Sequence, residues 1–503
     1  MPKYLLGTDN GGTVSKAALF TLDGKEIAVA ARQTELLTPK AGFVERDMAK
    51  MWTATAEAIK EVVTKSGVDP ADIACVACTG HGNGIYLIDK DGEPTRNAIM
   101  SSDGRARSYI EKWTADGVDK AIRPKTMQCI WPAQPNALLA WIRDNEPDVL
   151  KKSAHVLMAK DFIRYRLTGE AYAELTDMSG CSLMNVGTGE YDADVLEAFG
   201  IGEMQRLLPP LKRTADICGQ ITSKAAELTG LKEGTPVAGG MFDIDACGLA
   251  SGITDESQLC VVVGTWGNNQ YISDKPVIDG VFMTSCYSIP GYYLMLEGSA
   301  TSAGNLEWFV NQFFAAEKQL AKEQGRSVYD ICNELVAATD PKESKVIFLP
   351  FLYGSNAGMD AKSCLVGMAS HHSRSDVLRA IYEGVVFAHM THMDNLKSFR
   401  NMPETIRLTG GAARSDVWLQ IFADCFQSTV EIPDGTEQGT LGAAIAAGVA
   451  VGCFKDYQEA IDKMVSFSKR IEPNPEMKDL YQEKYYRYKK IIETLDPVWK
   501  DLG

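Results

Sequence analysis

The sequence predicts an α/β protein made of two similar halves, and three observations carry this prediction. Its 503 residues, 45% hydrophobic and 23% charged, are too many for one core and have the balance of an ordinary globular protein. Short apolar runs typical of buried strands are separated by longer stretches with helical periodicity. A strand followed by Gly-Thr-Asp-Asn-Gly-Gly near residue 7 is echoed by one followed by Gly-Thr-Trp-Gly-Asn-Asn near residue 264. The echo divides the chain into residues 1–252 and 253–503, each opening with the same kind of hairpin.

Charge and composition exclude several classes of function. The chain has 51 Lys plus Arg against 66 Asp plus Glu, a net charge of −15, which argues against a nucleic-acid partner or an anionic membrane surface. We find neither an export leader nor an apolar run of the roughly 20 residues that span a bilayer, so a cytoplasmic location is expected. The 12 cysteines are scattered, which favours buried thiols over disulfides. Cys75 and Cys78 lie in an apolar strand without a second pair to complete a metal site.

The first hairpin has the composition of a phosphate-binding turn. Its strand over residues 4–6 leads to Asn-Gly-Gly, a common hairpin sequence because both residue types tolerate a positive φ, and the chain returns over residues 17–20. Turn N–H groups with nearby hydroxyl and ammonium donors can face an anion, and a carboxylate at the strand end can hold hydrated Mg²⁺. These roles would fall to Asp9 for the metal and to Gly11, Gly12, Thr13 and Lys16 for phosphate. An ordinary hairpin without a ligand is an equally open alternative.

Two further strand ends carry polar side chains. After a helix from Met48 to about residue 66, capped by Asp47, a strand over residues 72–79 ends in a Gly-His-Gly-Asn-Gly sequence in which His81 and Asn83 can face a ligand. Asp103 follows the strand at residues 98–100, where its carboxylate suits a polyol hydroxyl. The alternatives are a solvent-facing connection for the first segment and a helix cap at Asp103 for the second.

The middle of the chain places a carboxylate at a predicted helix start. Asp243 stands between a glycine pair and a small-residue helix, and from this pattern alone it, or Asp245, is best interpreted as a helix cap. The second hairpin follows, with a strand over residues 259–263 leading to Gly264 and Thr265. No Gly-x-x-x-x-Gly-Lys-Ser/Thr sequence occurs, so a P-loop does not supply phosphate binding.

The second half contains a further glycine turn at a strand end. The strand over residues 406–409 leads to Gly410, Gly411 and Ala412, where a flat base or a ribose can approach the backbone. A small-residue helix over residues 438–448 can pack tightly beneath. Close packing of helix on sheet explains the same glycines without a ligand and can hold at the same time.

Taken in order, these segments resemble the FGGY carbohydrate kinases, whose two domains share the ribonuclease-H-like, actin-like ATPase fold with a cleft between them. The segments that carry the resemblance are residues 7–16, 42–47, 103–105, 239–252, 264–265, 410–412 and 439–448. Within the family the chain is most similar to the L-xylulose kinase branch, through residues 97–103, 240–243 and 301–309.

The resemblance implies an ATP-dependent and Mg²⁺-dependent kinase that phosphorylates a terminal hydroxyl of a ketopentose, L-xylulose or xylulose. It implies that Asp243 is the general base and, with Asp9, a metal ligand. The remaining implied contacts are Gly11, Gly12, Thr13, Lys16, Gly264 and Thr265 for phosphate, Gly410, Gly411 and Ala412 for adenosine, and His81, Asn83, Asp103 and Asp243 for the sugar.

Several alternatives stay open on the sequence alone. Erythritol, ribulose, gluconate and glycerol are rival acceptors, and a non-catalytic sugar sensor on the same fold is a rival class. The expected partner is a small sugar, with neither nucleic acid nor membrane. The oligomeric state is open, with a homodimer as one alternative.

Overall fold

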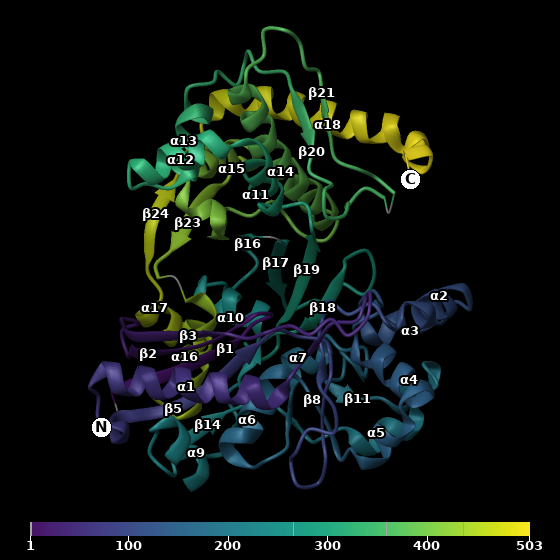
Figure 1. Ribbon diagram of the computed structural model, residues 1–503, viewed down its shortest axis with the longest axis vertical. Helices are drawn as coiled ribbons and strands as arrows, with labels where there is room; N and C mark the ends of the chain where they lie inside the picture. The colour runs from purple at the N-terminus through teal and green to yellow at the C-terminus, as the bar shows by residue number, and fades with distance from the viewer. Residues whose placement is uncertain (1–2, 265, 359, 436, 503) are drawn as a thin grey trace. The chain divides into compact units, whose positions relative to one another are not determined.

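The computed structural model describes residues 3–264, 266–358, 360–435 and 437–502, and its chain forms two compact units (Figure 1). The first unit comprises Met1–Thr254, Ile272–Met295 and Gly435–Ser466, and the second comprises Asp255–Tyr271, Leu296–Asp434 and Phe467–Gly503. Both units combine a mixed sheet with helices, so the predicted two-domain α/β class is confirmed. The division by sequence at residue 252 stays a prediction.

The first unit contains most of the short strands. Its strands are β1 (Tyr4–Asn10), β2 (Val14–Thr21), β3 (Glu26–Gln33), β4 (Glu45–Arg46), β5 (Ile73–Gly80), β6 (Tyr86–Ile88), β7 (Ala98–Ile99), β8 (His155–Leu157), β9 (Ala173–Glu174), β10 (Met184–Asn185), β11 (Glu190–Tyr191), β12 (Leu211–Lys212), β13 (Ile217–Gln220), β14 (Pro236–Ala238), β15 (Met241–Phe242) and β18 (Met283–Cys286). Its helices are α1 (Met48–Ser66), α2 (Arg107–Ala115), α3 (Val118–Thr126), α4 (Pro135–Asn145), α5 (Pro147–Lys152), α6 (Ala159–Thr168), α7 (Leu175–Ser179), α8 (Ala193–Ala198), α9 (Ser223–Thr229), α10 (Asp243–Ala250), α16 (Gln438–Ala450) and α17 (Tyr457–Met464).

The main sheet of the first unit has the strand order β13-β14-β5-β1-β2-β3, with β15 beside β5. Strand β1 pairs antiparallel with β2, which confirms the predicted hairpin, and parallel with β5. Side chains alternate across a strand. Leu6 therefore joins the core cluster beneath α1, whereas Gly7 lies against Thr440 of α16. Because β1 and β5 are parallel, the hairpin turn and the segment after Gly80 meet at one sheet edge.

Helix α1 follows the sequence prediction closely. Asp47 is its N-cap and accepts a hydrogen bond from the N–H of Lys50, and Gly67 ends the helix in the left-handed conformation. The alternative interpretation of Asp103 as a helix cap is wrong, because helix α2 begins at Arg107 without a side-chain cap. Strand β8 ends at Leu157, and the polar residues Lys160 and Asp161 that follow it lie in helix α6.

The second unit contains a sheet with the order β19-β17-β16-β22-β23-β24. Its strands are β16 (Gln258–Val263), β17 (Gly267–Ser273), β19 (Tyr293–Ser299), β20 (Ile347–Leu349), β21 (Cys364–Val366), β22 (Thr405–Gly410), β23 (Thr429–Pro433) and β24 (Phe467–Ile471). Its helices are α11 (Gly304–Phe313), α12 (Ala315–Glu323), α13 (Val328–Ala337), α14 (Arg374–Leu396), α15 (Asp416–Phe426) and α18 (Lys478–Leu495). The antiparallel pair β16 and β17 confirms the second predicted hairpin, and β22 runs parallel to β16.

All twelve cysteines are free, and Cys75 and Cys78 are buried in β5. Within the described ranges, no helix is both long enough and apolar enough to cross a bilayer.

Candidate functional site

Two carboxylates form the centre of the candidate site in the first unit. Asp9 is the next-to-last residue of β1, and Asp243 is the first residue of α10. Phe242 is the N-cap residue and makes no side-chain cap bond, so Asp243 is not the N-cap that the local pattern suggested. A Cβ atom on Gly439 would lie 2.5 Å from Oδ2 of Asp9, so the start of α16 meets the Asp9 carboxylate without an intervening side chain.

The two carboxylates influence each other electrostatically. Burial raises the pKa of Asp9 to about 6, with Lys16 opposing the rise and Glu437 adding to it. The pKa of Asp243 is raised well above its usual value, first by burial and then by the negative charges of Asp9 and Asp177. Negative charges held close together in a poorly solvated place favour a proton or a cation between them. This arrangement suits proton acceptance at Asp243 and cation binding beside Asp9.

The turn of the first hairpin is exposed to solvent and is held by hydrogen bonds from Arg46. Gly12 and Thr13 are exposed, and a Cβ on Gly12 would have no neighbour within 4 Å. Arg46 is buried and donates to the carbonyl oxygen of Gly11 at 2.9 Å and to that of Gly12. The sequence pattern did not indicate this role for Arg46. With these carbonyl groups turned toward Arg46, the turn has a fixed conformation. Asn10, Gly11 and Gly12 all have φ angles outside the left-handed region. The turn is therefore present as predicted, but it does not use the tolerance of a positive φ from which it was predicted.

Lys16 has a partner inside the unit. Its Nζ lies 2.8 Å from Oε2 of Glu437, which immediately precedes α16. The ammonium group keeps further N–H donors, but its charge is balanced by a neighbouring carboxylate.

His81 and Asn83 follow β5 at the same sheet edge, as predicted, and both are buried. Nδ1 of His81 lies 3.2 Å from the carbonyl oxygen of Gly82, which can only accept, and Nε2 lies 2.8 Å from the hydroxyl of Tyr86. Burial, together with the positive charge of Arg46, lowers the pKa of His81 to about 4, so the imidazole is neutral at pH 7. Asn83 has a left-handed backbone, with φ of 59°, and its buried Oδ1 has no partner among the described residues.

The carboxylate of Asp103 is fully engaged by the protein. It accepts from the N–H groups of Val44 at 2.6 Å and Arg105 at 2.8 Å and binds the Arg105 guanidinium through both oxygens. Arg105 also pairs with Glu45 at 2.9 Å. Asp103 therefore ties the end of β7 to the loop before β4, and a sugar hydroxyl would have to share an oxygen already in use.

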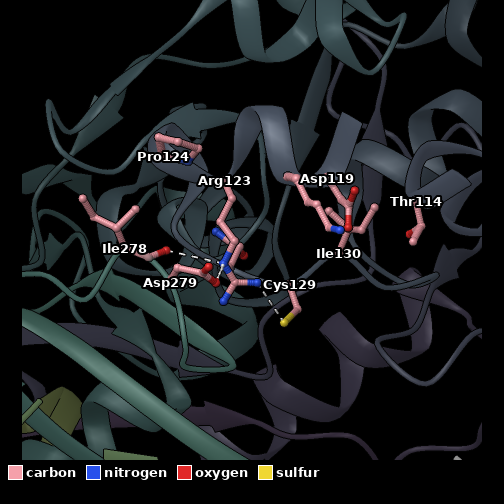
Figure 2. A pocket seen from close by; sticks show the side chains of 10 residues that line it. Thr114, Asp119, Arg123, Pro124, Cys129, Ile130, Ile278 and Asp279 are labelled. Carbon is pink, nitrogen blue, oxygen red and sulfur yellow. Dashed lines mark hydrogen bonds and ion pairs between the residues drawn. The ribbon is translucent and has the colours of Figure 1, made fainter. Parts of the chain in front are cut away.

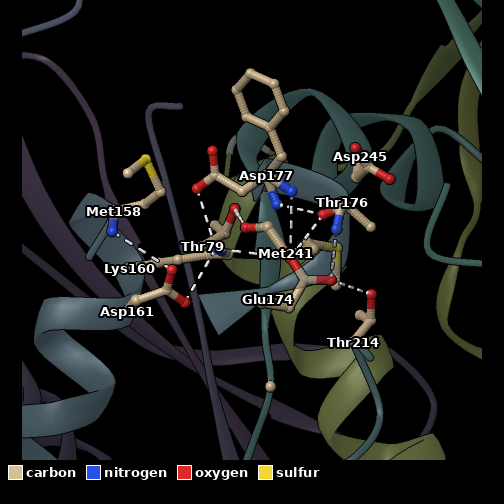
Figure 3. A network of polar contacts seen from close by, with 12 residues as sticks. Thr79, Met158, Lys160, Asp161, Glu174, Thr176, Asp177, Thr214, Met241 and Asp245 are labelled. Carbon is tan, nitrogen blue, oxygen red and sulfur yellow. Dashed lines mark hydrogen bonds and ion pairs between the residues drawn. The ribbon is translucent and has the colours of Figure 1, made fainter. Parts of the chain in front are cut away.

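A buried ion network lies beside Asp243 and was not found from the sequence. Lys160 of α6 is fully buried and contacts Asp161 at 3.1 Å, Asp177 at 3.0 Å and Glu174 at 3.6 Å (Figure 3). Burial alone would lower the pKa of Lys160, but these three carboxylates raise it. Burial raises the pKa of Asp177 to about 7 although Lys160 opposes the rise. Sequence pattern could not reveal the network because its members come from α6, β9 and α7.

The second unit contains a cavity of about 350 Å³ at the ends of two parallel strands. Gly264, after β16, and Gly411, after β22, line it together with Tyr382 and Trp418. Inside it, Oδ1 of Asn333 accepts from Ser415 at 2.7 Å and from Tyr382 at 2.9 Å. Aromatic walls with a few oriented polar groups are typical of a cavity for a flat ligand.

Two other residues predicted to contact the nucleotide, Gly410 and Ala412, shape the backbone near this cavity. Gly410 has a φ of 91°, a conformation that favours glycine. A Cβ atom at this position would also lie 2.5 Å from the carbonyl oxygen of Val263, so only glycine fits here. Ala412 is buried beside the turn. Thr265 lies outside the described residues.

A separate cavity of about 430 Å³ lies beside α3 in the first unit (Figure 2). Arg123 projects into it, but its guanidinium pairs with Asp279 at 2.9 Å and donates to the carbonyl oxygens of Ile278 and Val281. The positive charge is therefore used to hold the segment around residue 280 against α3.

Comparison with known proteins gives matches over nearly the whole chain. The model of the N-terminal domain of the FGGY family of carbohydrate kinases matches residues 4–249, and that of the C-terminal domain matches residues 259–451. L-xylulose/3-keto-L-gulonate kinase of Escherichia coli (strain K12) is 39% identical over 498 residues, 98% of each chain. Probable L-xylulose kinase of Pasteurella multocida (strain Pm70) is 37% identical over 98% of this chain and 99% of its own. The crystal structure of xylulose kinase from Rhodospirillum rubrum matches with a TM-score of 0.89 and 27% identity, over 99% of this chain and 100% of that chain.

Proposed function

Because the chain belongs to the FGGY family of carbohydrate kinases, we propose that it transfers the terminal phosphoryl group of ATP to a terminal hydroxyl of a ketopentose, with L-xylulose as the first candidate. The predicted family and its actin-like two-domain fold are confirmed by these matches. The choice of L-xylulose is supported by the names of two relatives with identities of 37% and 39% over nearly full length.

The placement of Asp243 carries the proposal. An alcohol is a weak nucleophile, and a carboxylate within hydrogen-bond reach removes its proton as the new bond forms. The acceptor oxygen forms a bond to the γ-phosphorus, the bond from that phosphorus to the bridging oxygen breaks, ADP leaves, and the hydroxyl proton passes to Asp243. The raised pKa of Asp243 fits a group that takes up a proton.

The residues around Asp9 fit a hydrated magnesium ion. In the described part of the chain no cluster of three or more His, Cys, Asp or Glu side chains forms a metal cage. Mg²⁺ is commonly bound by one or two carboxylates, with water and substrate phosphates completing its shell. Asp9 and Asp243 supply such a pair, and Gly439 lets the start of α16 pack directly against the Asp9 carboxylate. When bound, the ion would neutralise phosphate charge, and the N–H groups of Gly12 and Thr13 would add donors. The N–H of Gly11 already donates to the carbonyl oxygen of Val14 at 3.0 Å.

The cavity in the second unit is the proposed site of the nucleoside. The Asn333 amide oxygen is occupied by two hydroxyl donors, so its NH₂ group is the part that can donate to a base. The turn at Gly410 and Gly411 and the side chain of Trp418 would border the adenosine. Thr265 stays a predicted phosphate residue.

A neutral acceptor fits the first unit better than a sugar acid. The Escherichia coli relative is named for 3-keto-L-gulonate as well as L-xylulose, so both acceptors have to be compared. Oδ1 of Asp177 lies next to Gly82, between His81 and Asn83 in the chain, and neither it nor Oδ1 of Asn83 has a donor among the described residues. A sugar carboxylate, which only accepts hydrogen bonds when ionised, could not donate to either. We therefore place the neutral ketopentose first.

The free cysteines and the net charge of −15 support a cytoplasmic enzyme without a nucleic-acid or membrane partner. The acceptor is a small sugar, and a homodimer is one alternative for the oligomeric state.

An acceptor screen tests the proposed function. ADP release with ATP and Mg²⁺ is measured for L-xylulose, D-xylulose, ribulose, erythritol, gluconate, glycerol and 3-keto-L-gulonate, and L-xylulose should have the highest kcat/KM. Asp243→Asn should lower kcat about 10²- to 10⁴-fold, the usual contribution of a general base, while sugar binding persists in calorimetry. Equal rates on every acceptor would refute the sugar assignment. Wild-type turnover in the Asp243 variant would refute the assigned base.

A further inference from the structure

Asp177 has one carboxylate oxygen in use and one without a partner. The residue lies in α7 and is completely buried. Its Oδ2 accepts from Nζ of Lys160 at 3.0 Å, whereas Oδ1 has no hydrogen-bond partner within the described ranges. A buried acceptor without a donor costs free energy, and native structures rarely leave one unmatched without a reason. Oδ1 therefore suits a donor that the chain itself does not provide.

The unpartnered oxygen faces residues of the proposed acceptor site. A Cβ atom on Gly82 would lie 2.9 Å from Oδ1 of Asp177 and 2.3 Å from the ring of Phe242. Gly82 stands between His81 and Asn83, and Phe242 directly precedes Asp243. Oδ1 of Asn83 is also buried without a partner among the residues the structure describes. Two buried acceptors without donors thus belong to Asp177 and to the residue that follows Gly82, and a ligand rich in hydroxyl groups has the donors that they lack.

Lys160 fixes the direction of the Asp177 carboxylate. Figure 3 shows the oxygen of Asp177 that is linked to Lys160 and the second oxygen pointing away from that contact. Asp161 is held in addition by Arg164 at 2.8 Å. Glu174 accepts from the N–H and hydroxyl of Thr176 and from Thr214. Since the other carboxylates of the network have several donors each, Asp177 is the member with capacity left.

We propose that Oδ1 of Asp177 accepts a hydrogen bond from a hydroxyl of the acceptor sugar other than the one that is phosphorylated, making Asp177 a substrate-binding residue that selects for that hydroxyl. The inference rests on the proposed sugar-kinase function and adds a contact to it. A site built around a buried acceptor rejects an analogue that lacks the matching hydroxyl, because the acceptor is then left unpaired. Asp177 would therefore act in specificity, whereas Asp243 acts on the reacting hydroxyl.

The test combines a variant with a set of deoxy sugars. Asp177→Asn keeps the shape of the side chain, and kcat/KM and sugar affinity by calorimetry are measured for the preferred sugar and for each analogue lacking one non-reacting hydroxyl. Asp177→Asn should lower kcat/KM for the full sugar about 10- to 100-fold, the range for a hydrogen bond to a charged group. For one deoxy analogue, the variant and wild type should agree within about threefold, as expected when the interaction is already absent.

Glu174→Gln is the matched control. Glu174 is equally buried and contacts the same lysine, but both its oxygens are used inside the protein. A purely structural effect of disturbing the network would therefore appear in both variants and would be equal for all sugars. If Asp177→Asn does not fold, Asp177→Ser is measured in its place, because its shorter side chain removes the oxygen at the position of Oδ1 and should remove the same discrimination.

Each outcome is decisive. Loss of discrimination against one deoxy sugar in Asp177→Asn but not in Glu174→Gln supports the contact. Equal losses for every sugar, the same pattern in the control, or unchanged kinetics overturn it. Failure of the proposed function is separate: the wild-type enzyme would then release no ADP with any sugar of the screen, and the calorimetric comparison of full and deoxy sugars would still decide the Asp177 contact.

Discussion

Replacing His81 should remove a large part of the acid sensitivity of the first unit. The pKa of His81 is lowered from 6.5 to about 4 by burial and by the charge of Arg46. Between these two values the unfolded chain binds a proton that the folded chain does not, so acid favours unfolding. The free energy of unfolding that depends on neutral His81 is fully present above pH 6.5 and falls as the pH drops toward 4.

The size of this effect follows from the two pKa values. At pH 4.5 the unfolded imidazole is almost fully protonated and the folded one is mostly neutral, so wild type should lose about 2–3 kcal/mol relative to pH 7.5 through this group alone. His81→Gln cannot take up a proton and should lack this part of the pH dependence. Tyr86→Phe removes the hydroxyl at Nε2 but keeps the imidazole, so it should retain most of it.

Urea unfolding of the three proteins at pH 7.5, 6.0 and 4.5 measures the difference. The pKa of His81 itself is obtained independently from the exchange rate of its C2 hydrogen, followed by mass spectrometry. Parallel stability curves for wild type and His81→Gln, or a measured pKa near 6.5, would refute the reasoning. In that case the imidazole would be solvated in the folded protein, and His81 would be better placed to bind a ligand than to hold Tyr86 of β6.

Three further predictions concern the backbone and the two ligand sites. Gly442→Ala should lower the free energy of unfolding by about 1–3 kcal/mol, because the new Cβ would lie 2.2 Å from the carbonyl oxygen of Ala246; a gain in urea stability, as for an ordinary helical glycine, would contradict this. Asp9→Ala should raise the Mg²⁺ concentration for half-maximal activity by at least about tenfold, and an unchanged Mg²⁺ titration would remove Asp9 from the metal site. Asn333→Leu should raise KM for ATP about tenfold with KM for the sugar unchanged; equal changes in both would point to a general disturbance.

The sequence predicted those parts of the fold that depend on local chemistry. Asp47 caps α1, the Asn-Gly-Gly turn joins β1 to β2, and the strand before Gly264 opens the second hairpin. Each of these depends on residues close together in the chain, where propensity and capping act directly.

What the sequence could not predict depends on contacts between distant segments. Nothing near Asp103 indicates that Val44 and Arg105 occupy its carboxylate. Likewise, Lys160 and Asp177 have ordinary sequence surroundings, and only the fold brings α6 and α7 together around a buried charge. The hydrogen-bond capacity left over at Asp177 and Asn83 is a property of the packed chain, which no local pattern records.

The place of α16 in the chain has a consequence for how the protein is synthesised. This helix covers the face of β1 that carries Leu5 and Gly7. Residues 255–437, however, are synthesised after β1 and before α16. At translation rates of about 5–20 residues per second, that face of β1 stays uncovered for on the order of 10–40 s before α16 is made. The nascent first unit therefore exposes an apolar strand surface while the second unit is being made. A truncated chain ending at Thr254 should aggregate, whereas co-expression with a segment containing Gly435–Ser466 should rescue it.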